Sequence, residues 1–392
     1  MNTKESKMKV LYLTTMYPTP QYTQKGIFCH EQVKALKRLG IDVDVVVPIP
    51  FYEREVSVKE WCYEGIGVKY VRFFKLPGAN DFHRTGKVLF RVLERNIDIK
   101  KYDLYHADAP LPSGYAVMLA SEKYKIPFLI HGHGLDVFLD GSYEGYRNCS
   151  KITEVCKEVY VRANAVVGVS QKVLEKIEKR VNIDDKAYVV YNGVDVEAFY
   201  PIKKEEKKEI VVTSIGNLIP LKGHVYTLKA FKKLIDKGYT NLRFQLAGRG
   251  ELERDLKILV RELGIEQYVE FKGYVPYSDI VKLLQETDIF VLPSYYEALG
   301  CVYLEAMACE VPTIGCKGNG IDEIIVNGEN GYLVNPKEVE EIVACLDKLL
   351  DYKTRRVIGK KARETVVEKY QWRHSAETLA KIYKKLYSVK EE

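Results

Sequence analysis

Short runs of consecutive apolar residues alternate with longer amphipathic segments along the whole chain. In the first half, the apolar runs Lys9–Thr14 and Ile41–Val47 flank the amphipathic segment Glu31–Leu39, which Gly40 ends. Continuous apolar runs of this length are typical of strands that are buried on both faces of a parallel sheet. Further runs of the same kind predict strands at Asp103–His106, Phe128–Ile130, Ala165–Val169 and Tyr188–Tyr191.

The second half of the chain repeats this alternation. The pattern predicts strands at Ile210–Ile215, Arg243–Ala247, Val269–Phe271, Ile289–Leu292 and Thr313–Gly315. It predicts helices at His224–Lys237, Glu251–Leu263, Ser278–Gln285, Val302–Ala308, Val339–Leu350, Thr354–Tyr370 and Trp372–Tyr387. Strands that alternate with helices indicate an α/β protein with doubly wound parallel sheets. Because such sheets bind ligands outside the carboxyl ends of their strands, we expect the chemistry in the loops that follow strands.

The repeat at domain scale predicts two Rossmann-like domains facing a central cleft. We expect an N-terminal domain of residues 1–200 and a C-terminal domain of residues 201–371, with the helix at 372–392 packing back on the first domain. The charged stretch Lys203–Glu209 has no apolar anchor and is the expected linker.

Composition and charge narrow the class of protein. Of the 392 residues, 46% are hydrophobic and 29% are charged, and 60 Lys and Arg against 54 Asp and Glu give a net charge of +6. This mild excess disfavours a nucleic-acid partner. No apolar run reaches the ~18 residues of a membrane-spanning helix. The eight cysteines form no CxxC pair, and no export signal is evident, so we expect reduced thiols in a cytoplasmic protein.

The strongest chemical signal follows the strand predicted at 289–292. Glu297 and Glu305 lie eight positions apart, and the backbone N–H groups of Leu299, Gly300 and Cys301 fall between them, at the expected start of a helix. A helix N-terminus favours phosphate, and carboxylates accept hydrogen bonds from vicinal hydroxyls, so the pair suits a sugar–diphosphate–ribose ligand. A helix with one capping and one surface glutamate is the alternative.

Glycine-rich turns follow several other predicted strands. Gly216 and Lys222 lie in the turn after the strand at 210–215, and Arg249 lies in the turn after the next strand. Each turn is suited to phosphate oxygens, although a solvated surface turn fits each of them equally well. In the first half, Gly26 follows the first strand, and His131 and His133 follow the strand at 128–130. A metal site at these histidines is not expected, because no third histidine or cysteine has suitable spacing.

Taken together, these segments resemble the retaining glycosyltransferases of family 4, the glycogen-synthase-like group with the GT-B fold. The resemblance runs from Met8 to about Leu386 and rests on seven segments in the family's order. They are Gly26, His133–Asp136, Asn192–Pro201, Gly216–Gly223, Glu297–Glu305, Asn319–Glu323 and Asn327–Val334.

The resemblance implies a role for each matching residue. Glu297 would hold hydroxyls of the donor sugar, and Glu305 would hold the ribose. Lys222 would neutralise the leaving diphosphate, and His133 would contact the sugar beside the reacting carbon. The implied catalytic residues are His133, Lys222 and Glu297. The implied donor-binding residues are Gly26, Gly216, Asn217, Lys222, Arg249, Glu297, Leu299, Gly300, Cys301 and Glu305.

The chain departs from the family pattern at three positions. Asn217 stands where the family usually has a phosphate-binding arginine, and we expect Arg249 in the neighbouring turn to supply the missing charge. Glu310 replaces a glycine after the Glu297–Glu305 segment, and Asn319 replaces the first glycine of a Gly-Gly pair.

The resemblance implies transfer of a hexose or N-acetylhexosamine from a nucleotide-diphosphate sugar, a UDP-sugar or else a GDP-sugar, to a hydroxyl acceptor. It implies retention of configuration and no metal or other cofactor. A nucleotide-sugar epimerase and a non-catalytic sugar-nucleotide-binding protein remain as alternatives. A nicotinamide-dependent oxidoreductase is disfavoured, because neither half carries GxGxxG after its first strand.

The acceptor is not evident from the motifs, but the segment Val68–Lys101 is basic and amphipathic. It could contact an anionic membrane from the cytoplasmic side, which would favour a lipid-linked glycan or a cell-envelope polysaccharide as acceptor. A solvated helix face is the alternative.

Overall fold

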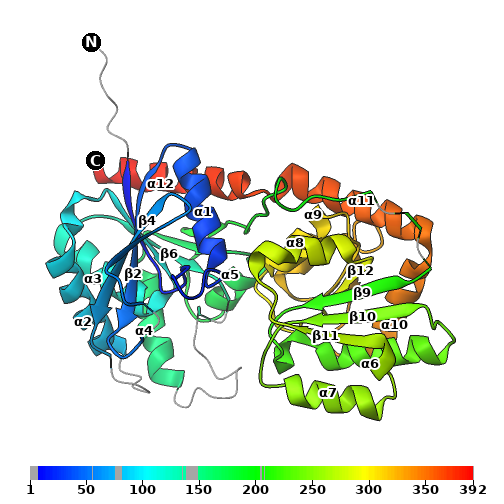
Figure 1. Ribbon diagram of the computed structural model, residues 1–392. Coiled ribbons are helices and arrows are strands. Elements are labelled where there is room, and N and C mark those ends of the chain that lie inside the picture. The colour runs from blue at the N-terminus through cyan, green and yellow to red at the C-terminus, as the bar shows by residue number, and fades with distance from the viewer. Residues whose placement is uncertain are drawn as a thin grey trace. The chain divides into compact units, whose positions relative to one another are not determined.

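The computed structural model describes residues 8–54, 56–75, 82–134, 136–137, 149–203, 205–206 and 208–391. The chain forms two compact units, Met1–Asn192 with Trp372–Glu392 and Gly193–Gln371 (Figure 1). Residues 193–200, which the sequence placed in the first domain, thus belong to the second unit. There, the backbone N–H of Val194 donates to Tyr370 at 2.9 Å, and the carbonyl of Phe199 accepts from Arg363 at 3.2 Å.

The first unit is built on an eight-stranded sheet in the order β3-β4-β2-β1-β5-β6-β7-β8. All neighbouring strands are parallel except β3 and β4, which form an antiparallel hairpin at one edge. The strands are β1 (Lys9–Leu13), β2 (Asp42–Pro50), β3 (Glu60–Tyr63), β4 (Ile66–Phe73), β5 (Leu104–Asp108), β6 (Phe128–Gly132), β7 (Ala165–Gly168) and β8 (Ala187–Val189). Except for β3, β4 and small shifts at strand ends, these are the strands that the apolar runs predict.

Helices cover the faces of this sheet. They are α1 (Ile27–Arg38), α2 (Phe82–Asn96), α3 (Tyr115–Tyr124), α4 (Cys149–Arg162), α5 (Gln171–Glu178) and α12 (Trp372–Glu391). The helix α12 comes from the far end of the chain and lies beside α1 (Figure 1). Its residues Ala376, Leu379 and Tyr383 join the core beneath the sheet, and its Ser375 hydroxyl accepts from Gln32 of α1 at 3.4 Å.

The basic segment at 68–101 is not one amphipathic element. It comprises most of β4, the helix α2 and a 3₁₀ turn at Ile99–Lys101, and its residues 76–81 lie outside the described part of the chain. Leu89 and Leu93 of α2 are buried in the core of the unit, so this apolar face is unavailable to a membrane. The exposed face of α2 instead carries the cations Arg84, Lys87, Arg91 and Arg95.

The second unit is built on a six-stranded parallel sheet in the order β11-β10-β9-β12-β13-β14. The strands are β9 (Ile210–Ile215), β10 (Leu242–Ala247), β11 (Val269–Gly273), β12 (Ile289–Val291), β13 (Thr313–Cys316) and β14 (Tyr332–Val334). The helices are α6 (His224–Asp236), α7 (Glu253–Glu262), α8 (Tyr277–Glu286), α9 (Cys301–Ala308), α10 (Val339–Leu350) and α11 (Tyr352–Lys369). Numbered within this unit, the strands have the order 3-2-1-4-5-6 of a Rossmann sheet. The direction in which successive strands are added to the sheet reverses between β9 and β12, and we call this place the reversal point.

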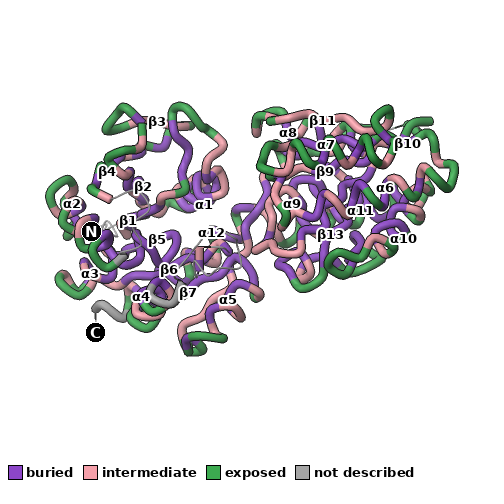
Figure 2. The backbone as a smooth tube through the Cα atoms, turned by 90° about the horizontal axis from the view of Figure 1, so that it is seen from below, coloured by how far each residue is buried: buried purple, intermediate pink, exposed green. Residues whose placement is uncertain are grey.

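Burial follows the sheets in both units: the strands are largely buried, and exposed residues concentrate on outer helix faces and loops (Figure 2). Among the described residues, seven cysteines are free thiols, and all but Cys62 and Cys301 are buried. None of the described helices combines the length and the apolar character that crossing a membrane would require.

Candidate functional site

The loops that flank the reversal point of the second sheet bring Lys222 and Glu297 together. Lys222 ends the loop after β9, and Glu297 lies in the loop after β12, the neighbouring strand. The Lys222 ammonium and the Glu297 carboxylate form an ion pair, and the two side chains are only 18% and 16% exposed. Since doubly wound sheets bind ligands at this reversal point, the pair lies where a ligand is expected.

Asn319 braces the loop that carries Glu297. Its side-chain carbonyl accepts from the Glu297 backbone N–H at 2.9 Å, and its amide donates to the Ser294 carbonyl at 2.7 Å. The next residue, Gly320, approaches so closely that a Cβ there would lie 1.8 Å from the Ala298 carbonyl oxygen. Asn319, which the sequence marked only as a departure from the family, thus ties the loop after β13 to the Glu297 loop.

The helix α9 begins at Cys301, between the two starts that the sequence suggested, Leu299 and Val302. Gly300 precedes Cys301, the first residue of α9, with a φ of 78° that favours glycine. Leu299 is fully buried, and Glu305 is 6% exposed inside the helix. The first turn of α9 therefore follows Glu297 closely, and its N–H groups and dipole favour an anion beside this carboxylate.

The turns after β9 and β10 pack directly on one another. The Leu218 N–H donates to the Arg249 carbonyl at 2.9 Å. A Cβ on Gly248 would lie 1.9 Å from the Gly216 carbonyl oxygen, and Gly248 has a φ of 145°. The Arg249 side chain is exposed, with its guanidinium 5.8 Å from the centre of the Tyr274 ring. The close packing brings the backbones of the two turns together. The contribution of Arg249 to phosphate binding stays a prediction.

A buried histidine contacts the loop that carries Lys222. His224, at the start of α6, lies 3.2 Å from the Ser214 hydroxyl through Nδ1 and 3.2 Å from the Asn217 carbonyl through Nε2. Burial lowers the pKa of His224 to about 4, so the ring is neutral at pH 7. Asn217 itself is exposed, and its carbonyl is the part that this contact fixes.

In the first unit, Gly26 lies in the loop after β1, very close to the backbone of Met16. It precedes α1 with a φ of 60°, and a Cβ there would lie 2.2 Å from the Met16 carbonyl oxygen. No other residue type fits this position without moving the loop. The early start of α1 at Ile27, four residues before the predicted start, follows from this turn.

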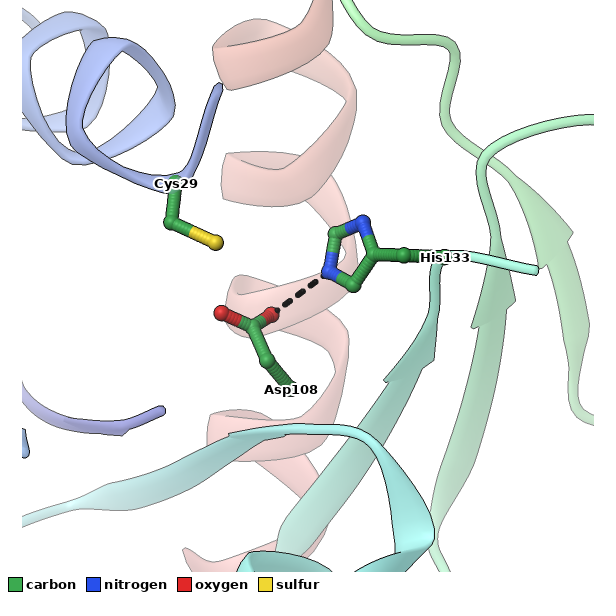
Figure 3. Close-up of side chains that lie close together, drawn as sticks. All are labelled: Cys29, Asp108 and His133. Carbon is green, nitrogen blue, oxygen red and sulfur yellow. Dashed lines mark hydrogen bonds and ion pairs between the residues drawn. The ribbon is translucent and has the colours of Figure 1, made fainter. Parts of the chain in front are cut away.

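His133 is part of a buried cluster at the carboxyl ends of β5 and β6. Its Nε2 lies 3.0 Å from the carboxylate of Asp108, which is 2% exposed (Figure 3). Its backbone N–H donates to both carboxylate oxygens of Asp136, at 3.0 and 3.1 Å. His106 and His131 complete the cluster with ring centroids 5.4 Å apart.

The charges of this cluster follow from its hydrogen bonds. Burial opposes ionisation of Asp108, but His133 and His106 overcome this effect and hold the pKa of the carboxyl well below its usual range. Burial likewise opposes protonation of His133, but the charge of Asp108 prevails and raises the pKa of the imidazole. Burial lowers the pKa of His131 well below its usual value, so this ring stays neutral. An ionised Asp108 accepts only, so Nε2 of His133 carries the shared proton.

The structure brings the expected donor-binding residues of the second unit to one edge of its sheet. Gly26 and His133 lie at the corresponding edge of the first sheet. The sequence patterns did not indicate Asp108, His224 or the bracing role of Asn319. Asp108 ends β5 and His224 begins α6. The sequence can indicate such a position, but it does not show which side chains the residue will contact.

Comparison with known proteins identifies the family of this chain. The family described as Glycosyltransferase Family 4 matches residues 26–198, and the family described as Glycosyl transferases group 1 matches residues 195–365. An uncharacterized glycosyltransferase of Methanocaldococcus jannaschii is 28% identical over 96% of this chain and 98% of its own length. The D-inositol 3-phosphate glycosyltransferase of Corynebacterium jeikeium is 30% identical over 77% of this chain and 76% of its own.

The structure of Anabaena HepE in complex with UDP and glucose superimposes with a TM-score of 0.75, at 19% identity, over 96% of this chain and 99% of that one. The chain belongs to the GT-B glycosyltransferases of the family 4 type, as its motifs predict. It is therefore a glycosyltransferase.

Proposed function

We propose that this glycosyltransferase moves a hexose or N-acetylhexosamine from a UDP-sugar to a hydroxyl acceptor with retention of configuration. The observation that carries the proposal is the Lys222–Glu297 pair at the reversal point of the second sheet, beside the first turn of α9. A cation for the diphosphate and a carboxylate for sugar hydroxyls then lie side by side. The UDP bound to Anabaena HepE supports the choice of base, with a GDP-sugar as the second candidate.

The mechanism follows from charge development in the transition state. As the bond from the sugar carbon to the diphosphate breaks, negative charge grows on the leaving oxygens and positive charge grows on the sugar. Lys222 and the N-terminus of α9 stabilise the leaving group, since preorganised charges act at little reorganisation cost. Glu297 holds sugar hydroxyls, Glu305 holds the ribose, and His133 contacts the sugar. Leaving-group stabilisation by these groups needs no divalent metal.

We further propose a lipid-linked glycan or cell-envelope polysaccharide as acceptor, reached from the cytoplasmic side of the membrane. The support is the exposed row of Arg84, Lys87, Arg91 and Arg95 on α2, which suits anionic headgroups by charge alone. Flotation with vesicles that contain or lack phosphatidylglycerol tests this contact. Reversing two of these charges should abolish the flotation that anionic lipid supports.

The transfer reaction is tested by mass spectrometry of UDP-sugars and GDP-sugars after incubation with the protein, with and without a panel of glycan acceptors. Acceptor-dependent release of nucleoside diphosphate and an α-linked product from an α-linked donor would support the proposal. An isomerised nucleotide-sugar formed without acceptor would indicate the epimerase instead. Binding without any turnover would indicate a non-catalytic protein. Turnover that a chelator stops and magnesium restores would contradict the metal-free mechanism.

A further inference from the structure

Cys29, Asp108 and His133 converge on one point of the first unit. They come from α1, the end of β5 and the loop after β6, which are far apart in the sequence (Figure 3). One ligand atom of each residue, the thiol sulfur, a carboxylate oxygen and a ring nitrogen, lies within 4.8 Å of the other two. These are the three ligand types that zinc prefers.

We propose that Cys29, Asp108 and His133 form a binding site for a soft divalent cation such as Zn²⁺, and that occupation of this site inhibits glycosyl transfer. Inhibition rests on the proposed function, in which His133 contacts the donor sugar. Binding rests only on the three side chains.

The spacing of the ligands suits a tetrahedral ion. Zinc bonds of ~2.0–2.3 Å place the ligand atoms about 3.3–3.6 Å from one another. The Nε2 of His133 and the Oδ1 of Asp108 are already 3.0 Å apart, so they need to separate by a few tenths of an ångström. The thiol of Cys29 has to approach by up to about 1.2–1.5 Å, a shift for which a rotation about its side-chain bond is available. An ion would then take the place of the shared proton.

His106 and Tyr383 hold the carboxylate of Asp108 in place through a chain of contacts. The Oδ1 of Asp108 lies 3.3 Å from Nε2 of His106, whose Nδ1 lies 2.5 Å from the hydroxyl of Tyr383 in α12. The other carboxylate oxygen, Oδ2, is buried and has no hydrogen-bond partner among the described residues. Metal-binding carboxylates are normally oriented by such outer contacts.

Binding changes the protonation of two ligands. The Cys29 thiol gives its proton to solvent as the sulfur–metal bond forms, and His133 binds through the Nε2 lone pair after Nε2 loses its proton. The carboxylate of Asp108 is already ionised. The two charges of the ion replace the two protons that leave, so the net charge of the site is unchanged. Inhibition follows instead because Nε2 of His133 is bound to the ion and can no longer contact the donor sugar.

The binding experiment uses the full chain with Co²⁺ and Zn²⁺ as probes. We expect one Co²⁺ per chain with a thiolate-to-cobalt charge-transfer band in the near ultraviolet, and its displacement by one equivalent of Zn²⁺. Cys29→Ser should remove the band and weaken Zn²⁺ binding at least tenfold. Cys62→Ser, which removes an exposed thiol on β3, is the matched control and should leave both unchanged. Equal Zn²⁺ binding by wild type and Cys29→Ser would contradict the proposed site. The circular dichroism spectrum of a second variant, Cys29→Ala, shows whether loss of the thiol disturbs the fold.

The activity experiment separates the site from the proposed function. Zn²⁺ should inhibit wild-type transfer at least tenfold at saturation, a chelator should restore it, and Mg²⁺ should have no effect. Cys29→Ser should keep its basal turnover and lose the inhibition. If Zn²⁺ binds through Cys29 but leaves turnover unchanged, the inhibitory role is wrong, and so is the placement of His133 against the donor. The metal site itself would still be supported.

Discussion

The polar groups at the carboxyl edges of the two sheets are built in different ways. In the second unit, Lys222 and Glu297 pair at partly accessible positions, and glycine-mediated contacts between neighbouring loops hold them. In the first unit, His106, Asp108 and His131 are almost completely buried, whereas His133 reaches solvent at 12% exposure. Accessible charges can contact a large anionic ligand. A buried charged cluster instead fixes the position and the protonation state of one side chain.

Removing either charge of the accessible pair should have the largest effect. Glu297→Ala should abolish transfer, and Lys222→Ala should slow it by about 10²–10⁴-fold, because each removes a preorganised group at a site of developing charge. Lys229→Ala, which removes an exposed lysine of α6, is the control and should retain full activity. Steady-state turnover measures all three, and near wild-type turnover of Glu297→Ala would remove that residue from the site.

A methyl group at Gly248 should break the loop contacts of the second unit. Its Cβ would lie 1.9 Å from the Gly216 carbonyl oxygen, so the two turns must separate. We expect a loss of about 3 kcal/mol of unfolding free energy and at least tenfold weaker nucleotide binding. Gly264→Ala has open space around its Cβ at a φ of 64°, and should cost only about 1 kcal/mol. Denaturant unfolding compares the two, and equal costs would contradict the close packing.

The buried histidine of the second unit should make its stability depend on pH. The pKa of His224 is about 4 in the folded chain and ~6.5 when unfolded, so the unfolded state binds the proton first. Stability is then complete above pH 6.5 and falls as the pH drops toward 4, with a loss of about 2 kcal/mol at pH 5. Chemical denaturation of wild type and His224→Leu across this range measures the effect, and parallel pH profiles would contradict it.

The smallest effect concerns the charge missing at Asn217. Arg249→Ala should weaken binding of UDP about tenfold, as expected for loss of one charge-assisted phosphate contact. Asn217→Arg should partly restore binding in the Arg249→Ala background. Calorimetric titration of the three proteins decides, and equal affinities of wild type and Arg249→Ala would leave the missing charge unexplained.

The sequence predicted the second unit more fully than the first. The strand at Ile210–Ile215 and the helix at Val339–Leu350 have the predicted bounds, because each strand, turn and helix there is a local apolar pattern with glycine punctuation. The short strand β14 was missed because its three residues follow a glycine-rich turn and carry no period of their own. The edge strand β3 was missed because it is exposed and lacks a continuous apolar run. The inner strand β4 was missed because glycine and charged residues interrupt its apolar positions.

The cluster around His133 could not be predicted in the same way. No cysteine lies near the two histidines in the sequence, yet Cys29 lies close to His133 in the fold. The start of α1 comes to the loop after β6, where the ring of Phe28 also contacts that of His133. Tyr383 reaches His106 from the last helix, 277 positions away. Local patterns place each element, but such contacts depend on which strands become neighbours in the sheet.

A crystal structure of the protein with a bound UDP-sugar tests the central claim most directly. We expect the diphosphate beside Lys222 and the first turn of α9, with the sugar hydroxyls on Glu297 and the ribose hydroxyls on Glu305. A nucleotide bound away from the loops after β9 and β12, with Lys222 and Glu297 still paired to each other, would contradict it.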